Sequence, residues 1–375
     1  MIKILVADDS AFMRKLLTDF FARQKDFQAV GAAKDGQEAV NLVKKLRPDV
    51  VTMDVNMPVM DGLKSLEIIM QECPTPVVML SSLTKEGTEE TIKALALGAV
   101  DFISKAGGSV SKIDNIEDEL LRKCREASQA RVQRVSMPTR ALSYVPRTPK
   151  PPVMKRIELP KRPGLNFAVR PNRNVAADSP RTSSSPSKKL VAIGTSTGGP
   201  QALQNVITRL PQNFPCGIVV VQHMPAGFTK SLAERLDSIS AIAVKEAEDN
   251  EIIKPGQVYI APGTHHMRIV NSSDGRKISL GSDPPVGNHR PAVNVLFDSV
   301  ANIGSDLVAV VMTGMGCDGC DGMKKIKANG GYSIAQDEAS STVYGMPKAV
   351  ADAGLVDEVQ PLSKIAEAIM EAVQK

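Results

Sequence analysis

A serine in a glycine-rich turn is the first candidate for chemistry in this chain of 375 residues. The segment VAIGTSTGGP, residues 191–200, consists of an apolar run followed by GTSTG, which has the spacing G-x-S-x-G around Ser196. Pro200 favours a helix start, so Ser196 is expected at a strand-to-helix turn whose N–H groups can stabilise an oxyanion. The lysine of a Walker loop and the G-x-G-x-x-G spacing of a dinucleotide loop are missing. A nucleophile and a helix cap remain as interpretations of Ser196.

A serine nucleophile needs a general base, and the chain contains four histidines. His223 follows the next apolar run, GIVVVQ, so we expect it beside Ser196 at the same edge of a parallel sheet. His265 and His266 follow the strand-like YIAPGT and are the reserve candidates for the base. A third apolar run, LVAVVMTGM, leads into a glycine-rich loop with Asp318. The sequence therefore predicts the set Ser196, His223 and Asp318, in an order that differs from that of common α/β hydrolases.

Two cysteines flank the predicted acid in the segment Cys317-Asp318-Gly319-Cys320. A zinc site would need further Cys or His ligands at suitable spacing, and no thioredoxin-like context surrounds this pair. The five cysteines of the chain are scattered, which does not indicate a disulfide framework. We therefore expect reduced thiols and no metal or redox role for this C-x-x-C.

A second set of polar residues lies at the ends of strand-like segments in the first 125 residues. The set comprises Asp8, Asp9, Asp54, Ser81 and Lys105. The strand-like segments alternate with helical patterns expected from about residues 10, 36, 63 and 85, which is typical of a doubly wound parallel sheet. The carboxyl ends of such strands meet at one edge, where three carboxylates repel one another unless a cation lies among them. Oxygen ligands alone favour Mg²⁺.

The net charge of +5 is concentrated in one segment of the chain. Residues 131–189 contain 14 Lys and Arg against Glu158 and Asp178, together with ten of the 25 prolines. Without a helical or strand period, this segment is interpreted as a flexible linker between two acidic domains. Contact of the basic linker with an acidic partner surface is the alternative to a solvated spacer.

These residues give the N-terminal segment a resemblance to two-component receiver domains. The resemblance implies that Asp54 is the phospho-acceptor, and that Ser81 and Lys105 contact the phosphoryl oxygens. It further implies a Mg²⁺ site formed by Asp8, Asp9, Asp54 and the backbone carbonyl of Asn56. Phe102 matches the aromatic switch position of receivers, and Ala106 stands where receivers usually have proline.

The C-terminal half resembles the bacterial chemotaxis receptor methylesterases, the CheB family. The resemblance is carried, in the family's order, by AIGTSTGGP, VVVQHMPAGFTKSLAERL, YIAPGTHHM, HRPAVNVLF, VVMTGMGCDGCDGM and IAQDEASSTVYGMP. It implies that Ser196 is the nucleophile, His223 the base and Asp318 its orienting acid, with Thr197 and Met315 at the oxyanion region. His289-Arg290-Pro291 matches a family motif. The residues that depart from the family's usual ones are Ala292, Asn294 and Cys317.

The predicted organisation is two α/β domains joined by the linker. Residues 1–125 are expected to form a doubly wound, five-stranded parallel receiver domain, and residues 126–187 the basic linker rich in Pro and Ser. Residues 188–375 are expected to form a doubly wound, mostly parallel catalytic domain. Apolar runs far shorter than a membrane span, and an N-terminus without a signal-peptide pattern, favour a cytoplasmic protein without membrane insertion.

The two resemblances together imply a phosphorylation-regulated hydrolase in chemotaxis. Its substrates would be glutamate methyl esters, and also glutamines, of methyl-accepting chemotaxis receptors, and its phosphodonor a chemotaxis histidine kinase. Mg²⁺ would serve phosphorylation of the receiver, and the esterase step would need no cofactor. Two alternatives remain. The first is a transcription regulator whose linker contacts DNA phosphates, although the C-terminal half shows no helix-turn-helix pattern. The second is a receptor-binding module without catalytic activity.

Overall fold

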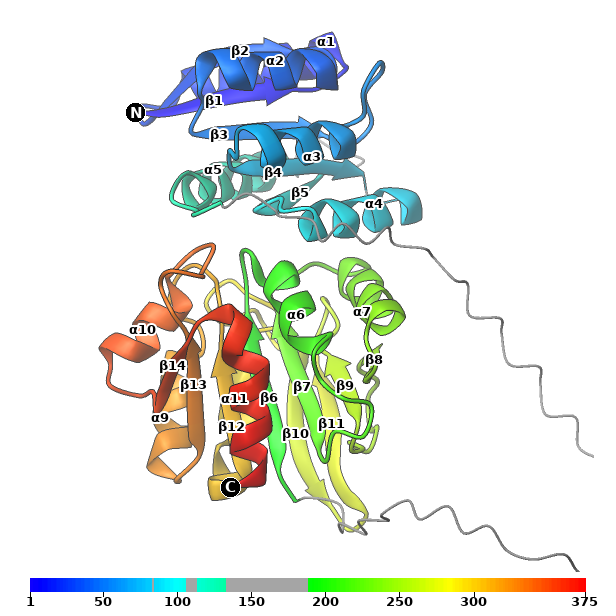
Figure 1. Ribbon diagram of the computed structural model, residues 1–375, viewed down its shortest axis with the longest axis vertical. Helices are drawn as coiled ribbons and strands as arrows, with labels where there is room; N and C mark the ends of the chain where they lie inside the picture. Colours follow the sequence, from blue (N-terminus) through cyan, green and yellow to red (C-terminus); the bar gives the residue numbers. More distant parts are fainter. Residues whose placement is uncertain (83, 106–112, 133–187) are drawn as a thin grey trace, which may run out of the picture. The chain divides into compact units, whose positions relative to one another are not determined.

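The computed structural model describes residues 1–82, 84–105, 113–132 and 188–375 (Figure 1). These residues group into one compact unit that contains two separate β-sheets of parallel strands and one antiparallel hairpin. Most of the predicted linker, residues 126–187, falls outside the described residues. None of the described helices is both long and apolar enough to cross a lipid bilayer.

The first sheet has five parallel strands, as the sequence predicted, and the structure places them in the order β2-β1-β3-β4-β5. Its elements are β1 (Ile2–Ala7), α1 (Ala11–Ala22), β2 (Phe27–Ala33), α2 (Gly36–Leu46), β3 (Val50–Asp54), α3 (Gly62–Glu72), β4 (Val77–Ser82), α4 (Lys85–Ala96), β5 (Asp101–Lys105) and α5 (Ile113–Ser128). Alternate residues of β1 point to opposite faces: Leu5 packs in a core with α2, α3 and α4, while Ile4 packs in a core with α1 and α5. The doubly wound receiver fold is thus confirmed.

Side chains that accept hydrogen bonds from the first helical turn define where these helices begin. The Ser10 hydroxyl accepts from the N–H of Met13 at 3.4 Å, and the Asp35 carboxylate accepts from the N–H of Glu38 at 2.8 Å. These N-caps satisfy donors that a helix leaves unpaired at its start. They also keep residues 8 and 9 out of α1, at the carboxyl end of β1.

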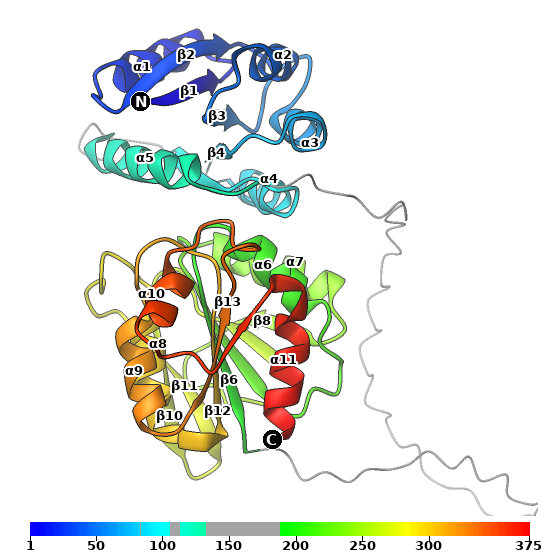
Figure 2. The ribbon, with the colours of Figure 1, turned by 60° about the vertical axis from the view of Figure 1, so that its left-hand side comes forward.

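The second sheet has seven strands in the order β14-β13-β12-β6-β7-β9-β8, and every neighbouring pair is parallel. Its domain contains β6 (Leu190–Thr195), α6 (Gly199–Ile207), β7 (Gly217–Gln222), α7 (Phe228–Ile239), β8 (Ala243–Glu246), β9 (Gln257–Ile260), β10 (His266–Ser272), β11 (Gly275–Gly281), α8 (Val293–Val300), η2 (Ala301–Asp306), β12 (Leu307–Val311), α9 (Cys320–Ala328), β13 (Tyr332–Gln336), α10 (Met346–Asp352), β14 (Glu358–Gln360) and α11 (Leu362–Gln374). Figure 2 shows α6 and α11 on one side of the sheet and α8, α9 and α10 on the other, so the predicted α/β class of this domain is confirmed.

The strand order of the second sheet reverses at β6. The chain leaves β6 for β7 on one side, and returns much later to place β12 on the other side. In open α/β sheets the crevice at such a reversal, outside the carboxyl ends of the strands, is where ligands bind. The segments that follow β6, β7 and β12 carry Ser196, His223 and Asp318, so the topology brings the three predicted residues to one crevice.

Candidate active site

Ser196 lies in a tight turn between β6 and α6, with 8% of its surface exposed. Gly198 has φ 77°, a left-handed conformation that lets the chain turn into α6, and a Cβ there would lie 2.5 Å from Thr342. Gly314 approaches from the loop after β12: a Cβ at this position would come within 2.8 Å of the Ser196 Cβ. The Ser196 N–H donates to the carbonyl of Thr313 at 3.0 Å. The serine backbone is therefore held from both sides.

His223 follows β7, and its ring lies between the serine and the acid. The ring nitrogen Nδ1 is 3.1 Å from Ser196 Oγ, and Nε2 is 2.7 Å from Asp318 Oδ2. The side chain is only 5% exposed. With Nε2 protonated and donating to the carboxylate, Nδ1 has a free lone pair for the serine proton. This is the arrangement of a general base and its orienting acid.

Asp318 is fixed by three donors. Its Oδ2 accepts from His223 and from the N–H of Val293 at 2.7 Å, and its Oδ1 accepts from the N–H of Asn294 at 2.9 Å. Burial by itself raises the pKa of this carboxyl, but the hydrogen bonds from His223 and the two backbone N–H groups hold the pKa below its usual value. Asp318 thus stays ionised beside the histidine, and the first turn of α8 orients it.

The two residues predicted for the oxyanion region both border Ser196. Thr197 follows Ser196 and is 4% exposed, and Met315 follows Gly314, which packs on the serine. Within the described ranges, no acceptor is recorded for the backbone N–H of either residue. Two such donors, at the start of α6 and in the β12 loop, are what an acyl-transfer site needs to stabilise the charge on a tetrahedral intermediate.

The reserve histidines lie away from the serine. His266 is fully buried, its Nε2 close to the carbonyl of Pro284 at 3.1 Å, and the ring of His265 bonds to Thr264. Two further contacts beside the predicted triad were not anticipated from the sequence. Gln222, 2% exposed, donates from Nε2 to the Ser196 carbonyl at 3.0 Å, and the ring of His289 stacks on that of His223. Gln222 directly precedes the predicted base, which was the available signal.

A cavity of about 720 Å³ opens over Ser196 and His223. Its wall includes residues of β5 and α5 as well as residues of the second domain. The Thr197 hydroxyl lies 2.9 Å from Asp101 Oδ2 and 3.0 Å from Glu126 Oε2, and the N–H of Gly198 donates to the carbonyl of Val100 at 3.2 Å. The first domain therefore contacts the turn that carries Ser196.

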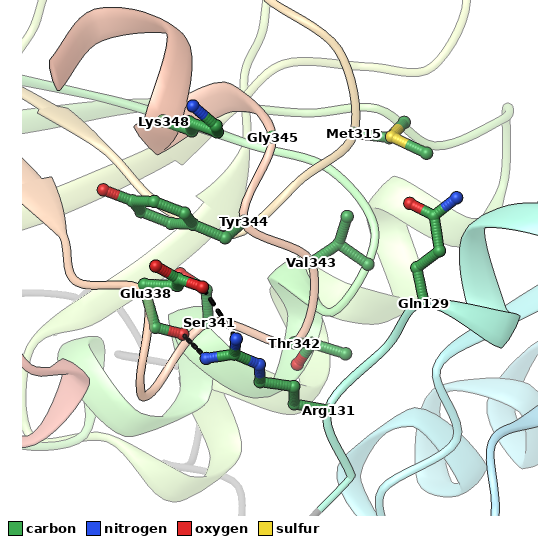
Figure 3. Close-up of a pocket in the computed structure, with 10 residues that line it drawn as sticks. All are labelled: Gln129, Arg131, Met315, Glu338, Ser341, Thr342, Val343, Tyr344, Gly345 and Lys348. Carbon is green, nitrogen blue, oxygen red and sulfur yellow. Dashed lines mark hydrogen bonds and ion pairs between the residues drawn. The ribbon is translucent and has the colours of Figure 1, made fainter. Parts of the chain in front are cut away.

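A second, smaller pocket of about 290 Å³ lies beside Met315 (Figure 3). Arg131, just after α5, forms an ion pair with Glu338 at 2.7 Å, and its N–H donates to the carbonyl of Thr342 at 2.9 Å. The ring of Tyr344 lies along the same wall (Figure 3). This pocket contains none of the three predicted catalytic residues, so we assign the chemistry to the larger cavity.

The predicted receiver site is assembled at the carboxyl edge of the first sheet. Ligand oxygens of Asp8, Asp9 and Asp54 all lie within 4.8 Å of one another. Lys105 Nζ lies 2.9 Å from Asp8 Oδ2 and 2.6 Å from Asp54 Oδ2. Burial raises the pKa of Asp54 against the opposing effect of Lys105, while the two carboxylates raise the pKa of Lys105 against its own burial. An all-oxygen set that shares one ammonium group fits a divalent cation.

The other predicted receiver residues differ in how far they are exposed. Asn56 is exposed and its side chain donates to Glu90 at 3.5 Å, and Ser81 is buried and donates to the carbonyl of Gly87 at 3.0 Å. Phe102 is buried, and its ring lies 4.2 Å from that of Phe228. Ala106 lies outside the described residues.

The three departures from the family pattern lie around Asp318. Ala292 is the N-cap of α8, and its N–H donates to His266 at 3.3 Å. The Asn294 side chain accepts from the N–H of Gly322 at 2.9 Å, so it joins α8 to α9. Cys317 is exposed and carries a free thiol, as does Cys320. No other Cys, His or acid joins these two thiols in a metal-binding group among the residues described.

Comparison with known families assigns both halves of the chain. Residues 191–369 match the family model described as CheB methylesterase, and residues 4–117 match the model described as response regulator receiver domain.

Curated relatives extend over the full length. A protein-glutamate methylesterase/protein-glutamine glutaminase of Geobacillus kaustophilus is 44% identical over 376 residues, covering 99% of each chain. A relative with the same description from Oleidesulfovibrio alaskensis is 45% identical over 387 residues and covers both chains completely. The crystal structure of the Thermotoga maritima CheB methylesterase catalytic domain is 50% identical with a TM-score of 0.48, and covers 49% of this chain and 97% of its own.

Proposed function

Because the chain belongs to the CheB methylesterase family and carries a receiver domain ahead of the esterase domain, we propose that it demethylates chemotaxis receptors under control of phosphorylation. The substrates are glutamate methyl esters on methyl-accepting chemotaxis receptors, and the result is sensory adaptation. The observation that carries the proposal is the position of the His223 ring between a serine and an acid. Its Nδ1 lies 3.1 Å from Ser196 Oγ, and its Nε2 lies 2.7 Å from Asp318 Oδ2.

Acylation of the serine is the first step of the proposed reaction. Ser196 Oγ attacks the ester carbonyl while its proton passes to Nδ1 of His223, and Asp318 stabilises the imidazolium that forms. The N–H groups of Thr197 and Met315 stabilise the oxyanion. Methanol then leaves with the proton from His223, and the glutamyl group remains on the serine.

Deacylation repeats the same sequence with water. His223 takes a proton from the attacking water, the bond to Ser196 breaks, and the serine recovers the proton, which restores a free glutamate on the receptor. An amide with ammonia as the leaving group follows the same course, so glutamine deamidation is the second activity that we propose. The residues of the chain suffice for both steps, and we propose that the esterase step uses no cofactor.

The receiver site is proposed to accept a phosphoryl group on Asp54 from a chemotaxis histidine kinase. Asp8, Asp9, Asp54 and the backbone carbonyl of Asn56 would hold Mg²⁺, which neutralises charge on the transferred phosphoryl group. Lys105 and Ser81 would contact the phosphoryl oxygens. We propose a cytoplasmic location, where both the kinase and the receptor glutamates are accessible.

We further propose that the unphosphorylated receiver restrains the esterase. The contacts of Asp101 and Glu126 with the Thr197 hydroxyl, and the α5 residues that line the cavity over His223, support this regulation. Residues 1–125, 126–187 and 188–375 are proposed as receiver, linker and esterase. The described elements lie close to these limits, since α5 ends at Ser128 and β6 begins at Leu190.

The decisive test is methanol release from methylated chemoreceptor by the purified chain, with a small phosphodonor and Mg²⁺. A non-catalytic receptor-binding module would bind the receptor and release no methanol. A chain that neither hydrolyses the ester nor binds the receptor would overturn the proposal as a whole.

A further inference from the structure

The ring of His289 covers one face of the predicted catalytic base. Its centroid lies 3.8 Å from the centroid of the His223 ring, and the two ring planes differ by 7°. The hydrogen bonds to Ser196 and Asp318 are made at the edge of the His223 ring, so they leave its faces uncovered. The stack therefore supplies a contact that the triad itself does not provide.

A tight turn holds His289 in place. Val286 and His289 exchange two backbone hydrogen bonds of 3.0 Å each, across Gly287 and Asn288, which have φ 58° and 66°. Positive φ at both central residues is the type I′ geometry of two-residue hairpins. The next residue, Arg290, donates to the carbonyls of Ser282 and Asp283 at 3.1 and 3.2 Å. Hydrogen bonds within the turn and from Arg290 thus fix the backbone that carries the His289 ring.

The ring of His289 contacts His223 through its aromatic face and not through its nitrogen atoms. Among the described residues, neither of its ring nitrogens has a hydrogen-bond partner. A histidine that served only as a hydrogen-bonding link would use these nitrogens, as His266 does. The parallel stack on His223 is consequently the contact that distinguishes this side chain.

The charge state of His289 suits a stack on a base that becomes a cation. Burial, and then the charge of a protonated His223, lower the pKa of His289 to about 4. Arg122 and Lys123 of α5 lower it further, and only Asp318 acts in the opposite direction. The ring is therefore uncharged at neutral pH, and does not oppose a proton on His223.

We propose that His289 is a positioning residue for the reaction: its stacked ring fixes the plane of His223 between Ser196 and Asp318 and gives the transient imidazolium a neutral aromatic face. A cation over an aromatic face is stabilised electrostatically, and a stacked ring also keeps water from that face of the base. This inference rests on the proposed esterase function, since it assigns a role within the same site.

The test compares the full-length wild type with His289→Phe, His289→Ala and His289→Lys, all with phosphodonor and Mg²⁺. His265→Ala is the matched control, because the ring of His265 bonds to Thr264 and not to a member of the triad. Two rates are measured: methanol release from methylated receptor, resolved into kcat and KM, and labelling of Ser196 by a fluorophosphonate. Melting temperatures of all variants show whether each one is folded.

The expected pattern separates positioning from simple packing. His289→Ala lowers kcat about 10- to 100-fold with KM changed less than about twofold, because a misplaced base costs rate rather than binding. His289→Phe keeps the stack and stays within about threefold of wild type. His289→Lys loses as much as alanine, and its acidic limb of kcat/KM moves to lower pH because a fixed positive charge opposes protonation of His223.

Three results would overturn the role of His289. They are a His289→Ala kcat within about twofold of wild type, a phenylalanine variant as damaged as alanine, or a loss confined to KM. Failure of the proposed function has a different signature: labelling that depends on Ser196 without methanol release. In that case the labelling rates of the His289 variants still test the stack.

Discussion

His223 approaches Ser196 through Nδ1, which lies 3.1 Å from the serine Oγ. In the serine-protease triad the nitrogen that faces the serine is Nε2, and Nδ1 faces the acid, so the ring is used here in the opposite sense. The proposed mechanism requires the tautomer with its proton on Nε2, which lies 2.7 Å from Asp318 Oδ2. The mechanism therefore depends on Asp318 selecting this tautomer.

Removal of any member of the triad should abolish most of the activity. Ser196→Ala should leave no methanol release, because no other hydroxyl in the turn faces His223. His223→Ala and Asp318→Asn should each lower kcat by at least about 10³-fold, and combination with Ser196→Ala should add little, since the three act as a unit. Steady-state methanol assays on single and double variants measure this. Damage by His265→Ala in place of His223→Ala would show that the base is misassigned.

Asp318 predicts a pH dependence of stability with a definite sign. Despite its burial, hydrogen bonds from His223 and the α8 backbone hold the pKa of Asp318 below its usual value. A carboxyl of this kind stabilises the fold above its unfolded pKa of about 3.9, and the contribution is lost as the pH falls through the lower, folded value. Urea denaturation of wild type and Asp318→Asn, from about pH 6 to about pH 3, should show a difference in unfolding free energy that shrinks toward acid. A difference that widens toward acid would contradict the lowered pKa.

Phosphorylation at Asp54 should raise the rate of the full chain. The fragment from residue 187 to 375 should be faster than the unphosphorylated full chain, because it lacks the receiver contacts at Thr197. A small phosphodonor with Mg²⁺ should bring the full chain toward the fragment rate. Asp54→Ala should prevent that rise and leave the basal rate of the full chain unchanged. A fragment no faster than the full chain would mean that the receiver does not inhibit.

The two carboxylates that lie within hydrogen-bond distance of the Thr197 hydroxyl should contribute to this restraint. The single hydroxyl proton can be donated to only one of them at a time, and Asp101→Asn with Glu126→Gln removes the charge from both acceptors, which weakens a charge-assisted hydrogen bond of about 1.5–3 kcal/mol. The basal methanol release of the unphosphorylated chain should rise several-fold, and the further gain with phosphodonor should shrink. Arg125→Gln is a suitable control, since Arg125 in the same helix pairs with Asp26, away from Thr197. A basal rate unchanged by the double variant would exclude these contacts as a source of inhibition.

Much of the fold could be predicted because its signals are local. Helix starts near residues 10, 36, 63 and 85 follow from the alternation of strand-like and helical patterns, and the helices begin at Ala11, Gly36, Gly62 and Lys85. The convergence of Ser196, His223 and Asp318 follows from the rule that parallel strand ends share an edge. Each of these inferences needs only residues close together in the chain.

The contacts that escaped prediction join segments distant in the chain. The stack of His289 on His223 depends on how the turn after β11 folds over β7, and the acceptors of the Thr197 hydroxyl come from β5 and α5. Side-chain contacts of this kind are set by tertiary packing, for which composition and periodicity carry no signal. Neither a lone histidine nor a buried glutamate identifies its partner from sequence.

The position of β6 between β7 and β12 has a consequence for biosynthesis. On the ribosome the receiver, whose elements end at Ser128, can complete its sheet early, whereas β6 gains its second neighbour only after Leu307–Val311 has been made. Domains of a nascent chain generally fold from the N-terminus onward, and pairing between distant strands is slow. The receiver is thus folded before Ser196 first meets Asp318, so under the proposed mechanism no newly made esterase domain is active ahead of the receiver.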